Sequence, residues 1–188
     1  MKTRFVGAAI LGLLSSTISA ADGDRQLQVI SSRAVPQIES ITVYQKKNGK
    51  WESVCELSKF DKPCLLTDEG PYEVFAKPKG GIPIKIVEGL TVKAGQKHEL
   101  KLAEVMGSVE VFGDNFPRAD RIVLTDERDP GPGEKGHVPI QAATEYRVDM
   151  AAPPGFYAVW VVPANGARAQ RVVERVRVLA GKSVRVGD

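Results

Sequence analysis

The stretch GFYAVWVVPANG at residues 155–166 repeats the pattern of GPYEVFAKPKGG at residues 70–81. Five identical residues recur at a constant offset of 85 positions: Gly70, Tyr72, Val74, Pro78 and Gly81 in the first copy, and Gly155, Tyr157, Val159, Pro163 and Gly166 in the second. In both copies a glycine precedes alternating apolar residues, and a proline and a glycine follow them. This order is typical of a strand that ends in a turn.

A second pair of stretches extends the repeat. After one inserted residue the offset becomes 86, and VEGLTVKAG at residues 87–95 matches VERVRVLAG at residues 173–181. This many matches with a single insertion indicate two copies of one structural unit. We therefore expect two tandem domains of about 80 residues each, at residues 22–104 and 105–188.

The first 21 residues have the composition of a secretory signal peptide. Lys2 and Arg4 precede an apolar run at residues 5–14, and small residues suited to cleavage continue to Ala20 and Ala21. The apolar run is too short for a permanent anchor, and no later stretch is long enough to span a bilayer. We expect a periplasmic or secreted mature protein without an integral membrane span.

Charge excludes one class of partner. Without Lys2 and Arg4, the 26 basic residues become 24, against 23 acidic residues. This balance gives no electrostatic footprint for nucleic acid, so we expect no nucleic-acid partner. Residues 105–188 carry nine Arg and two Lys, whereas residues 22–104 carry two Arg and eleven Lys. Arg suits bidentate anion binding, although drift between the copies is the simpler explanation.

An Asn48-Gly49 dipeptide separates two alternating segments, residues 41–44 and 51–57. It predicts a tight hairpin, because both residues accept positive φ values. Export makes the only two cysteines, Cys55 and Cys64, a predicted disulfide that tethers the hairpin to the next strand. Closing so short a loop stabilises the fold by roughly 2–3 kcal/mol. A redox pair or a metal site is the alternative, but the spacing is not Cys-x-x-Cys and no His is near.

The rest of the chain alternates short apolar segments with Gly and Pro turns. No segment has a helical period, and a loop rich in Gly, Pro and charge runs from Asp126 to His137. Short strands at regular spacing predict an all-β fold of two tandem small β-sandwiches, transthyretin-like or immunoglobulin-like.

The second unit resembles the carboxypeptidase regulatory-like (transthyretin-like) modules, which are also similar to the B-type repeats of collagen adhesins. The resemblance rests on G-x-V-x-V-x-G-x-x-x-P-x-A at residues 107–119, IVL at 122–124, P-G-x-Y at 154–157, NG at 165–166 and V-x-V-x-A-G at 176–181. It extends more weakly to residues 65–102. At residues 38–57 the hairpin and cysteines replace the Gly-x-Val opening, which leaves the strand order of the first unit open.

This resemblance implies a non-catalytic accessory, adhesive or stabilising protein without a cofactor. The hydrolase branch of the family uses several active-site histidines and a characteristic C-terminal tail, whereas this chain has only His98 and His137 and ends in VRVGD. Collagen-adhesin repeats often carry a Lys–Asn isopeptide bond beside a buried acid. Here the three asparagines, Asn48, Asn115 and Asn165, all lie beside turn residues.

Three acidic residues, Asp126, Glu127 and Asp129, are candidate metal ligands. They cluster in the Gly-rich loop, and Ca²⁺ prefers oxygen ligands of this kind. Their spacing matches no EF-hand, and Arg128 and Lys135 interleave with acidic residues. A solvated loop is the alternative, and calcium is the only cofactor that the sequence suggests.

Two tryptophans, Trp51 and Trp160, are candidate contacts for a sugar or a peptide, together with Tyr44 and Tyr157. Trp51 lies beside a Lys-rich hairpin tip and is expected to be exposed. Trp160 has the opposite parity to Tyr157 along its strand. Burial in the core is the alternative for both tryptophans.

Arg175 and Arg177 alternate with Val176 and Val178, which predicts that the arginines face solvent and the valines face the core. The two arginines are candidate contacts for an anionic glycan, a lipid headgroup or an acidic protein. A merely solvated face is the alternative.

The sequence therefore predicts a non-catalytic exported interaction or structural module of the cell envelope or secretome. Its partner is expected to be an envelope or secreted protein, and folds of this kind allow a partner strand to add to an exposed sheet edge. The alternatives are a carbohydrate-binding module that uses an exposed Trp, and a calcium-binding adhesion-type domain. We expect no enzyme, since the chain has no nucleophile elbow, phosphate loop or dinucleotide fingerprint.

Overall fold

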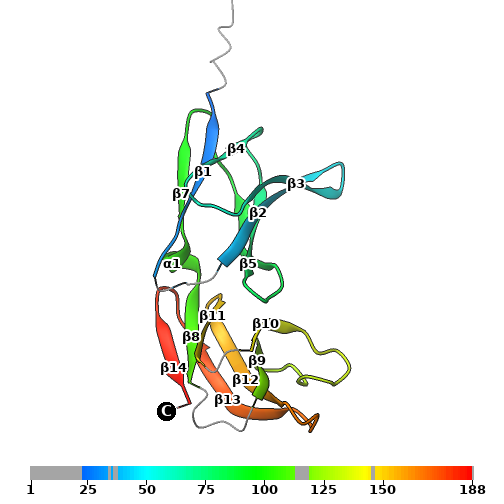
Figure 1. Ribbon diagram of the computed structural model, residues 1–188. Helices are drawn as coiled ribbons and strands as arrows, with labels where there is room; N and C mark the ends of the chain where they lie inside the picture. Colours follow the sequence, from blue (N-terminus) through cyan, green and yellow to red (C-terminus); the bar gives the residue numbers. More distant parts are fainter. Residues whose placement is uncertain (1–22, 34, 36–37, 113–118, 145–146, 188) are drawn as a thin grey trace, which may run out of the picture.

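A computed structural model describes residues 23–33, 35, 38–112, 119–144 and 147–187. Within these residues the chain forms strands β1 to β14 and one short helix, α1 (Leu102–Val105), arranged as two β-rich units (Figure 1). The predicted signal peptide lies outside the described residues. None of the helical segments in the described part is long and apolar enough to cross a membrane.

The first unit consists of two sheets with the strand orders β4-β1-β7 and β3-β2-β5-β6. A single hydrophobic core draws residues from all seven strands. The strands are β1 (Arg25–Ile30), β2 (Ile38–Lys47), β3 (Lys50–Leu57), β4 (Cys64–Leu66), β5 (Tyr72–Pro78), β6 (Ile84–Leu90) and β7 (Lys97–Lys101).

The second unit repeats this topology strand for strand, with the orders β11-β8-β14 and β10-β9-β12-β13. Its strands are β8 (Gly107–Phe112), β9 (Ala119–Asp126), β10 (Pro139–Ala143), β11 (Arg147–Ala152), β12 (Gly155–Pro163), β13 (Gln170–Val178) and β14 (Ser183–Val186). In each unit the first strand pairs in parallel with the last. The prediction of two tandem β-sandwich units is confirmed, and the strand order that the sequence left open is the same in both.

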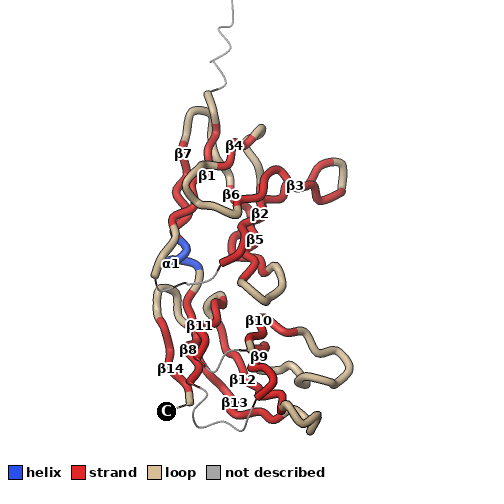
Figure 2. The backbone as a smooth tube through the Cα atoms, viewed as in Figure 1, coloured by secondary structure: helices blue, strands red, loops and turns tan. Residues whose placement is uncertain are grey.

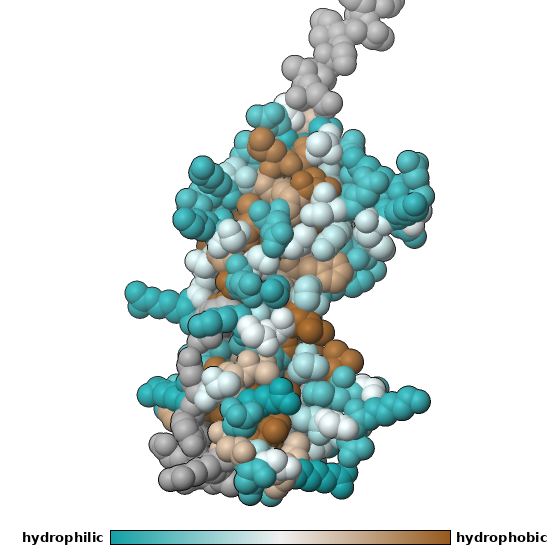
Figure 3. Space-filling view, turned by 45° about the vertical axis from the view of Figure 1, so that its right-hand side comes forward, coloured by the Kyte–Doolittle hydropathy of each residue, from teal (hydrophilic) through white to brown (hydrophobic). Residues whose placement is uncertain are grey.

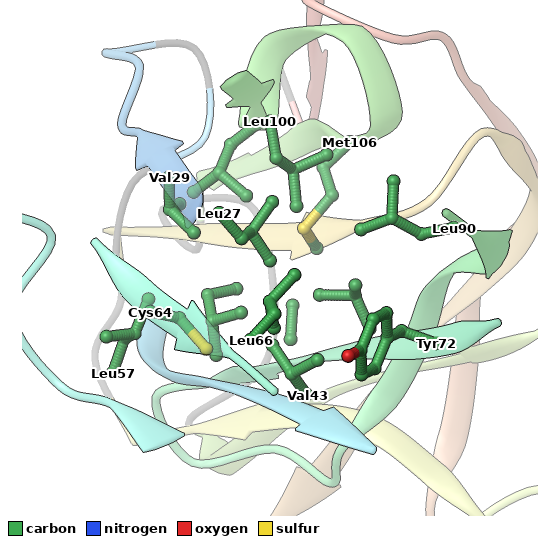
Figure 4. Packing of buried hydrophobic residues seen from close by; sticks show 14 of the residues in the cluster. Leu27, Val29, Val43, Leu57, Cys64, Leu66, Tyr72, Leu90, Leu100 and Met106 are labelled. Atoms are coloured by element: carbon green, nitrogen blue, oxygen red, sulfur yellow. The ribbon is translucent and has the colours of Figure 1, made fainter. Parts of the chain in front are cut away.

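The repeated stretches form β5 and β12, an inner strand of each four-stranded sheet. Tyr72, Val74 and Ala76 are completely buried, because alternate side chains of a strand point to one face. Figure 4 shows Tyr72 among the aliphatic side chains of the first core. Val159 and Val161 hold the equivalent positions in the second unit and are equally buried.

The tyrosine of each copy also fixes the turn before its strand. The Tyr72 hydroxyl donates to the carbonyl of Asp68 at 2.6 Å, and the Tyr157 hydroxyl donates to the carbonyl of Pro153 at 2.7 Å. In both cases the acceptor lies four residues earlier. Burial, with a smaller effect of Asp126, raises the pKa of Tyr157 to about 12, so this hydroxyl remains a donor.

The hairpin and the disulfide of the first unit are confirmed. Asn48 and Gly49 have φ values of 51° and 79°, and they join β2 to β3 with Lys47 opposite Lys50. Cys55 and Cys64 form the disulfide, with their Cα atoms 6.2 Å apart.

Two strands, β1 and β10, were not predicted from the sequence. In β10 the buried residue is Gln141, which is 1% exposed, while its neighbours Ile140 and Ala142 are only partly buried. A polar residue at the inward position removes the apolar alternation on which the prediction depends. The parallel pairings of β1 with β7 and β8 with β14 join segments distant in sequence, which local patterns do not reveal.

The inward Gln141 links the two units. Its side-chain amide donates from Nε2 to the carbonyl of Lys79 at 2.8 Å and accepts at Oε1 from the amide of Ala151 at 2.9 Å. Beside it, Gly80 and Ile82 bond the backbone of β10, with Ala142 N to Gly80 O at 3.1 Å and Ile82 N to Ile140 O at 3.3 Å. The loop after β5 thus pairs with an edge strand of the second unit.

The close backbone approach at this junction requires glycine. A Cβ atom on Gly81 would overlap the carbonyl oxygen of Ile140, and one on Gly80 would overlap that of Ala142. Ala151 of β11 also belongs to the core of the first unit, as does Met106, which follows α1. Backbone pairing and shared core residues therefore connect the two units at the waist visible in Figure 2.

Replacing Gln141 with Ala should weaken this junction. The substitution leaves the Lys79 carbonyl and the buried Ala151 amide without these partners, which should lower the free energy of unfolding by about 1–3 kcal/mol. Urea denaturation followed by circular dichroism measures the change. Gln170→Ala, at an exposed position of β13, is the matched control and should stay within about 0.5 kcal/mol of the parent. Equal midpoints for the two variants would show that Gln141 is not a structural link.

Candidate ligand-binding face

The outer face of the sheet β3-β2-β5-β6 carries a group of aromatic side chains. Val43 of β2 and Val74 of β5 are completely buried, so the next residues, Tyr44 and Phe75, point outward. Trp51 of β3 lies opposite Lys46 of β2 in the strand register. Three neighbouring strands thus each contribute one aromatic residue to the same end of this sheet.

These rings line an open hollow of about 260 Å³ together with Glu73 and Pro83. Tyr44 and Phe75 meet edge to face, with ring centroids 5.4 Å apart and an interplanar angle of 85°. Trp51 is 50% exposed, which confirms the expected exposure of this residue. The hollow therefore has aromatic walls, formed by one exposed ring and two partly buried rings.

One ion-paired carboxylate borders the hollow. Glu73 is largely covered, and its Oε1 lies 3.2 Å from Lys85 Nζ, which also pairs with Glu88 at 3.0 Å. The carboxylates of Glu88 and Glu73 hold the pKa of Lys85 above its ordinary value, so the ammonium group stays charged at neutral pH. The ion pair positions a hydrogen-bond acceptor and a donor beside the aromatic rings.

The polar ends of the hollow's rings are free. Among the described residues, neither the Tyr44 hydroxyl nor the Trp51 indole N–H has a hydrogen-bond partner. Elsewhere in the fold such groups are paired, as in the Tyr72 and Tyr157 hydroxyls and the Trp160 indole. Tyr44 and Trp51 therefore keep their hydrogen-bonding capacity for solvent or a ligand.

Apolar surface continues from the hollow toward the second unit. Pro83 lines the hollow, and the preceding Ile82 is 37% exposed and bonded to the backbone of half-buried Ile140. Val138, close by in sequence, is 51% exposed. Figure 3 shows hydrophobic surface at the waist between the units. The exposed apolar surface thus includes residues from both units.

The second unit has a tryptophan at the position equivalent to Phe75, but this ring is covered. Trp160 lies 85 positions after Phe75 and is partly buried beneath the loop that joins β9 to β10. A Cβ atom on Gly131 of this loop would overlap the indole ring. The indole N–H donates to Thr125 Oγ1 at 3.1 Å, and the Arg171 guanidinium lies 5.6 Å from the ring centroid. Trp160 therefore contributes to packing, and its role as a ligand contact stays a prediction.

Arg175 and Arg177 face solvent beside β12, as predicted, while Val176 and Val178 are buried. The Arg175 guanidinium lies 3.9 Å from the centroid of Phe156, and its Nε is 2.9 Å from a Glu127 carboxylate oxygen. Arg177 lies 5.8 Å from the same ring. One of the two charges is thus already compensated within the unit, and anion binding by this pair stays a prediction.

The acidic loop uses its carboxylates to hold its own backbone. Asp126 Oδ1 accepts from the Arg128 amide at 2.9 Å. Asp129 accepts from the amides of Gly131 at 2.8 Å and Val138 at 2.7 Å. Over the described ranges no three His, Cys, Asp or Glu side chains gather as a metal site. Calcium binding by Asp126, Glu127 and Asp129 stays a prediction without an assembled ligand set.

Asp129 is the central residue of this loop. Its Oδ1 also lies 2.7 Å from His137 Nδ1, and the Asp129 side chain is only 6% exposed. Burial opposes the charged form, but the hydrogen bonds from His137, Val138 and Gly131 outweigh burial and lower the pKa of Asp129 below 3.8. The carboxylate is therefore charged at neutral pH and ties the two ends of the loop together.

The structure brings together only part of the predicted contact set. Trp51 and Tyr44 share one hollow, whereas Trp160, Arg175 and Arg177 lie in the other unit. Sequence reasoning missed Glu73, Phe75 and Pro83 as members of the site. Strand parity offered a signal for the first two, because both alternate with the core residues of β5.

No family model matches the chain, and no curated protein matches it. Among solved structures it is similar to the Bacillus anthracis TIE protein, with a TM-score of 0.30 and 14% identity over 87% of this chain and 32% of that one. It is also similar to a leucine-rich repeat protein from Bacteroides thetaiotaomicron VPI-5482, with a TM-score of 0.24 and 15% identity over 87% of this chain and 25% of that one. The chain thus spans between a quarter and a third of these two proteins, and the similarity assigns neither family nor ligand.

Replacing Asp129 with Asn should destabilise the second unit in a pH-dependent manner. The folded-state pKa of Asp129 lies below its unfolded value, so the carboxylate's contribution is complete above about pH 4 and is lost as the pH falls through the folded pKa. We expect a loss of about 1–3 kcal/mol in unfolding free energy at pH 7 and a smaller loss at pH 3, both measured by urea denaturation. Asp120→Asn, at an exposed position, is the control. A difference from the parent that is the same at both pH values would contradict this role.

Proposed function

We propose that the chain is a non-catalytic exported interaction module that binds a component of the envelope or of the secreted material. Its ligand contacts the outer face of β3-β2-β5-β6. The observation that carries this proposal is the open hollow formed by Tyr44, Trp51 and Phe75. Exposed aromatic residues grouped around a concavity are typical of binding surfaces, and the disulfide and core behind the sheet provide a rigid support.

The disulfide supports the exported location. Disulfides form and persist in oxidising compartments such as the periplasm and the extracellular medium. Cys55 and Cys64 are the only cysteines of the chain, and both are in the disulfide. Together with the signal-like residues 1–21, this pairing favours a protein that acts outside the cytoplasm.

At the family level, we propose that both units are carboxypeptidase regulatory-like, or transthyretin-like, modules. The motif residues lie at equivalent places in the fold: Gly107 begins β8, Gly155 begins β12, and Gly181 lies in the turn before β14. The identical strand order of the two units extends the proposal to the first. Modules of this kind are mostly accessory or adhesive, which agrees with a binding role.

The aromatic face is a better candidate than the β7 edge of the first unit. Edge strand β7 presents Lys97, Glu99 and Lys101 to solvent, and charges along an edge discourage the addition of another strand. This observation favours recognition through Trp51 and its neighbours over strand addition at β7.

Trp51→Ala should abolish ligand capture while the protein stays folded. Trp51 is half exposed, so its replacement should lower the unfolding free energy by only about 1–2 kcal/mol. We expect immobilised mature protein to capture a reproducible component, protein or polysaccharide, from an envelope and culture-supernatant extract, and Trp51→Ala to lose it.

Leu65→Ala is the matched control, because Leu65 is 61% exposed on β4, in the other sheet of the same unit. This variant should capture the same component as the parent protein. Capture that persists in Trp51→Ala would show that the aromatic face is not the binding surface.

A further inference from the structure

The geometry points to a class of ligand for this face: we propose that the hollow binds one sugar ring within an uncharged polysaccharide. This inference rests on the proposed function of the face as the binding surface. It draws on the aromatic walls, the Glu73–Lys85 pair, the balance of charge and the size of the hollow.

The aromatic walls of the hollow suit the flat, apolar face of a sugar ring. One face of a pyranose ring presents mainly C–H groups, while its hydroxyl groups project around the rim. Tyr44, Trp51 and Phe75 provide apolar ring surface for such a face, and rigid aromatic residues bind at a low entropic cost. An aliphatic pocket would offer the same area but without the electron-rich ring faces that attract C–H groups.

The polar groups of the hollow suit the hydroxyl groups at the rim of a sugar ring. Sugar hydroxyls both donate and accept, and the hollow offers both kinds of partner. The Glu73 carboxylate lines the hollow and accepts hydrogen bonds, and a 3.2 Å contact with Lys85, which lies outside the lining, fixes this carboxylate before a ligand arrives. The Tyr44 hydroxyl and the Trp51 indole N–H, unpaired within the described structure, provide two more.

The same groups argue against a proline-rich peptide, which also docks in aromatic grooves. Such a segment offers backbone carbonyl acceptors but few donors. It would offer no donor to the second oxygen of the Glu73 carboxylate, whose Oε1 is already paired with Lys85. A ligand with hydroxyl groups satisfies the carboxylate and the ring at the same time.

Charge and size define the ligand further. Glu73 is the one charged residue among those that line the hollow, and Lys85 compensates its charge, so the hollow itself has no excess positive charge to attract an acidic sugar. The hollow is open and has a volume of about 260 Å³, which leaves room for a single sugar ring.

Affinity gel electrophoresis tests this proposal with soluble xylan, mannan and mixed-linkage glucan as uncharged probes, and alginate and polygalacturonate as acidic ones. We expect at least one uncharged polysaccharide to retard the mature protein and the acidic ones to have no greater effect. Trp51→Ala should weaken the binding by about tenfold or more, because it removes an aromatic ring that stacks on the sugar. Leu65→Ala should bind like the parent. Tyr44→Phe, which keeps the ring and removes the hydroxyl, should bind several-fold more weakly.

The outcomes separate this inference from the proposed function. If no uncharged polysaccharide binds while extract capture still requires Trp51, the ligand class is wrong and the binding face stands. If a polysaccharide binds equally well to Trp51→Ala, or only acidic ones bind, the inference is wrong as well. If neither polysaccharide binding nor extract capture requires Trp51, both proposals are wrong.

Discussion

The buried contact at the waist, centred on the Gln141 amide, is the constraint on which the rest of the structure depends. Each unit alone has a small core, and domains of this size are only modestly stable. Gln141 satisfies a carbonyl of the first unit and an amide of the second, and Ala151 adds a second-unit side chain to the first core. Two small sandwiches thereby support each other, and surface residues on both sides of the waist keep a fixed relation that needs no ordering when a ligand binds.

Much of the fold could be predicted because it depends on local patterns. Alternation identified β5 and β12, and the Asn48-Gly49 turn identified the hairpin. The pattern fails where a polar side chain faces inward. Gln141 is buried and makes two hydrogen bonds, one of them to the other unit, and β10 consequently lacks the apolar alternation of a strand. Parallel pairing between the first and last strands of each unit depends on tertiary contacts, which no local window contains.

The candidate site was predictable only in part, for a related reason. The place of Trp51 beside a hairpin tip indicated that it is exposed. The hollow, however, forms only because the pairing of the strands brings aromatic residues from three strands together. Tyr44 lies opposite Glu73 in the pairing of β2 with β5, almost thirty residues apart in sequence. Trp160 also lies at an outward-facing position of its strand, so the sequence pattern makes it an equally good candidate for an exposed ligand contact. Its covering by Gly131 depends on the path of a loop, which strand periodicity does not describe.

The loop between β9 and β10 accounts for the different exposure of two equivalent aromatic positions. Phe75 and Trp160 are counterparts in the repeat, yet a two-residue turn leaves the first open and a twelve-residue connection, from residue 127 to residue 138, covers the second. A change in the length of one connection is therefore enough to leave the outer face of one sheet exposed and to cover the outer face of the other. Selection can act on such insertions at little cost to folding, because closure entropy rises slowly with loop length.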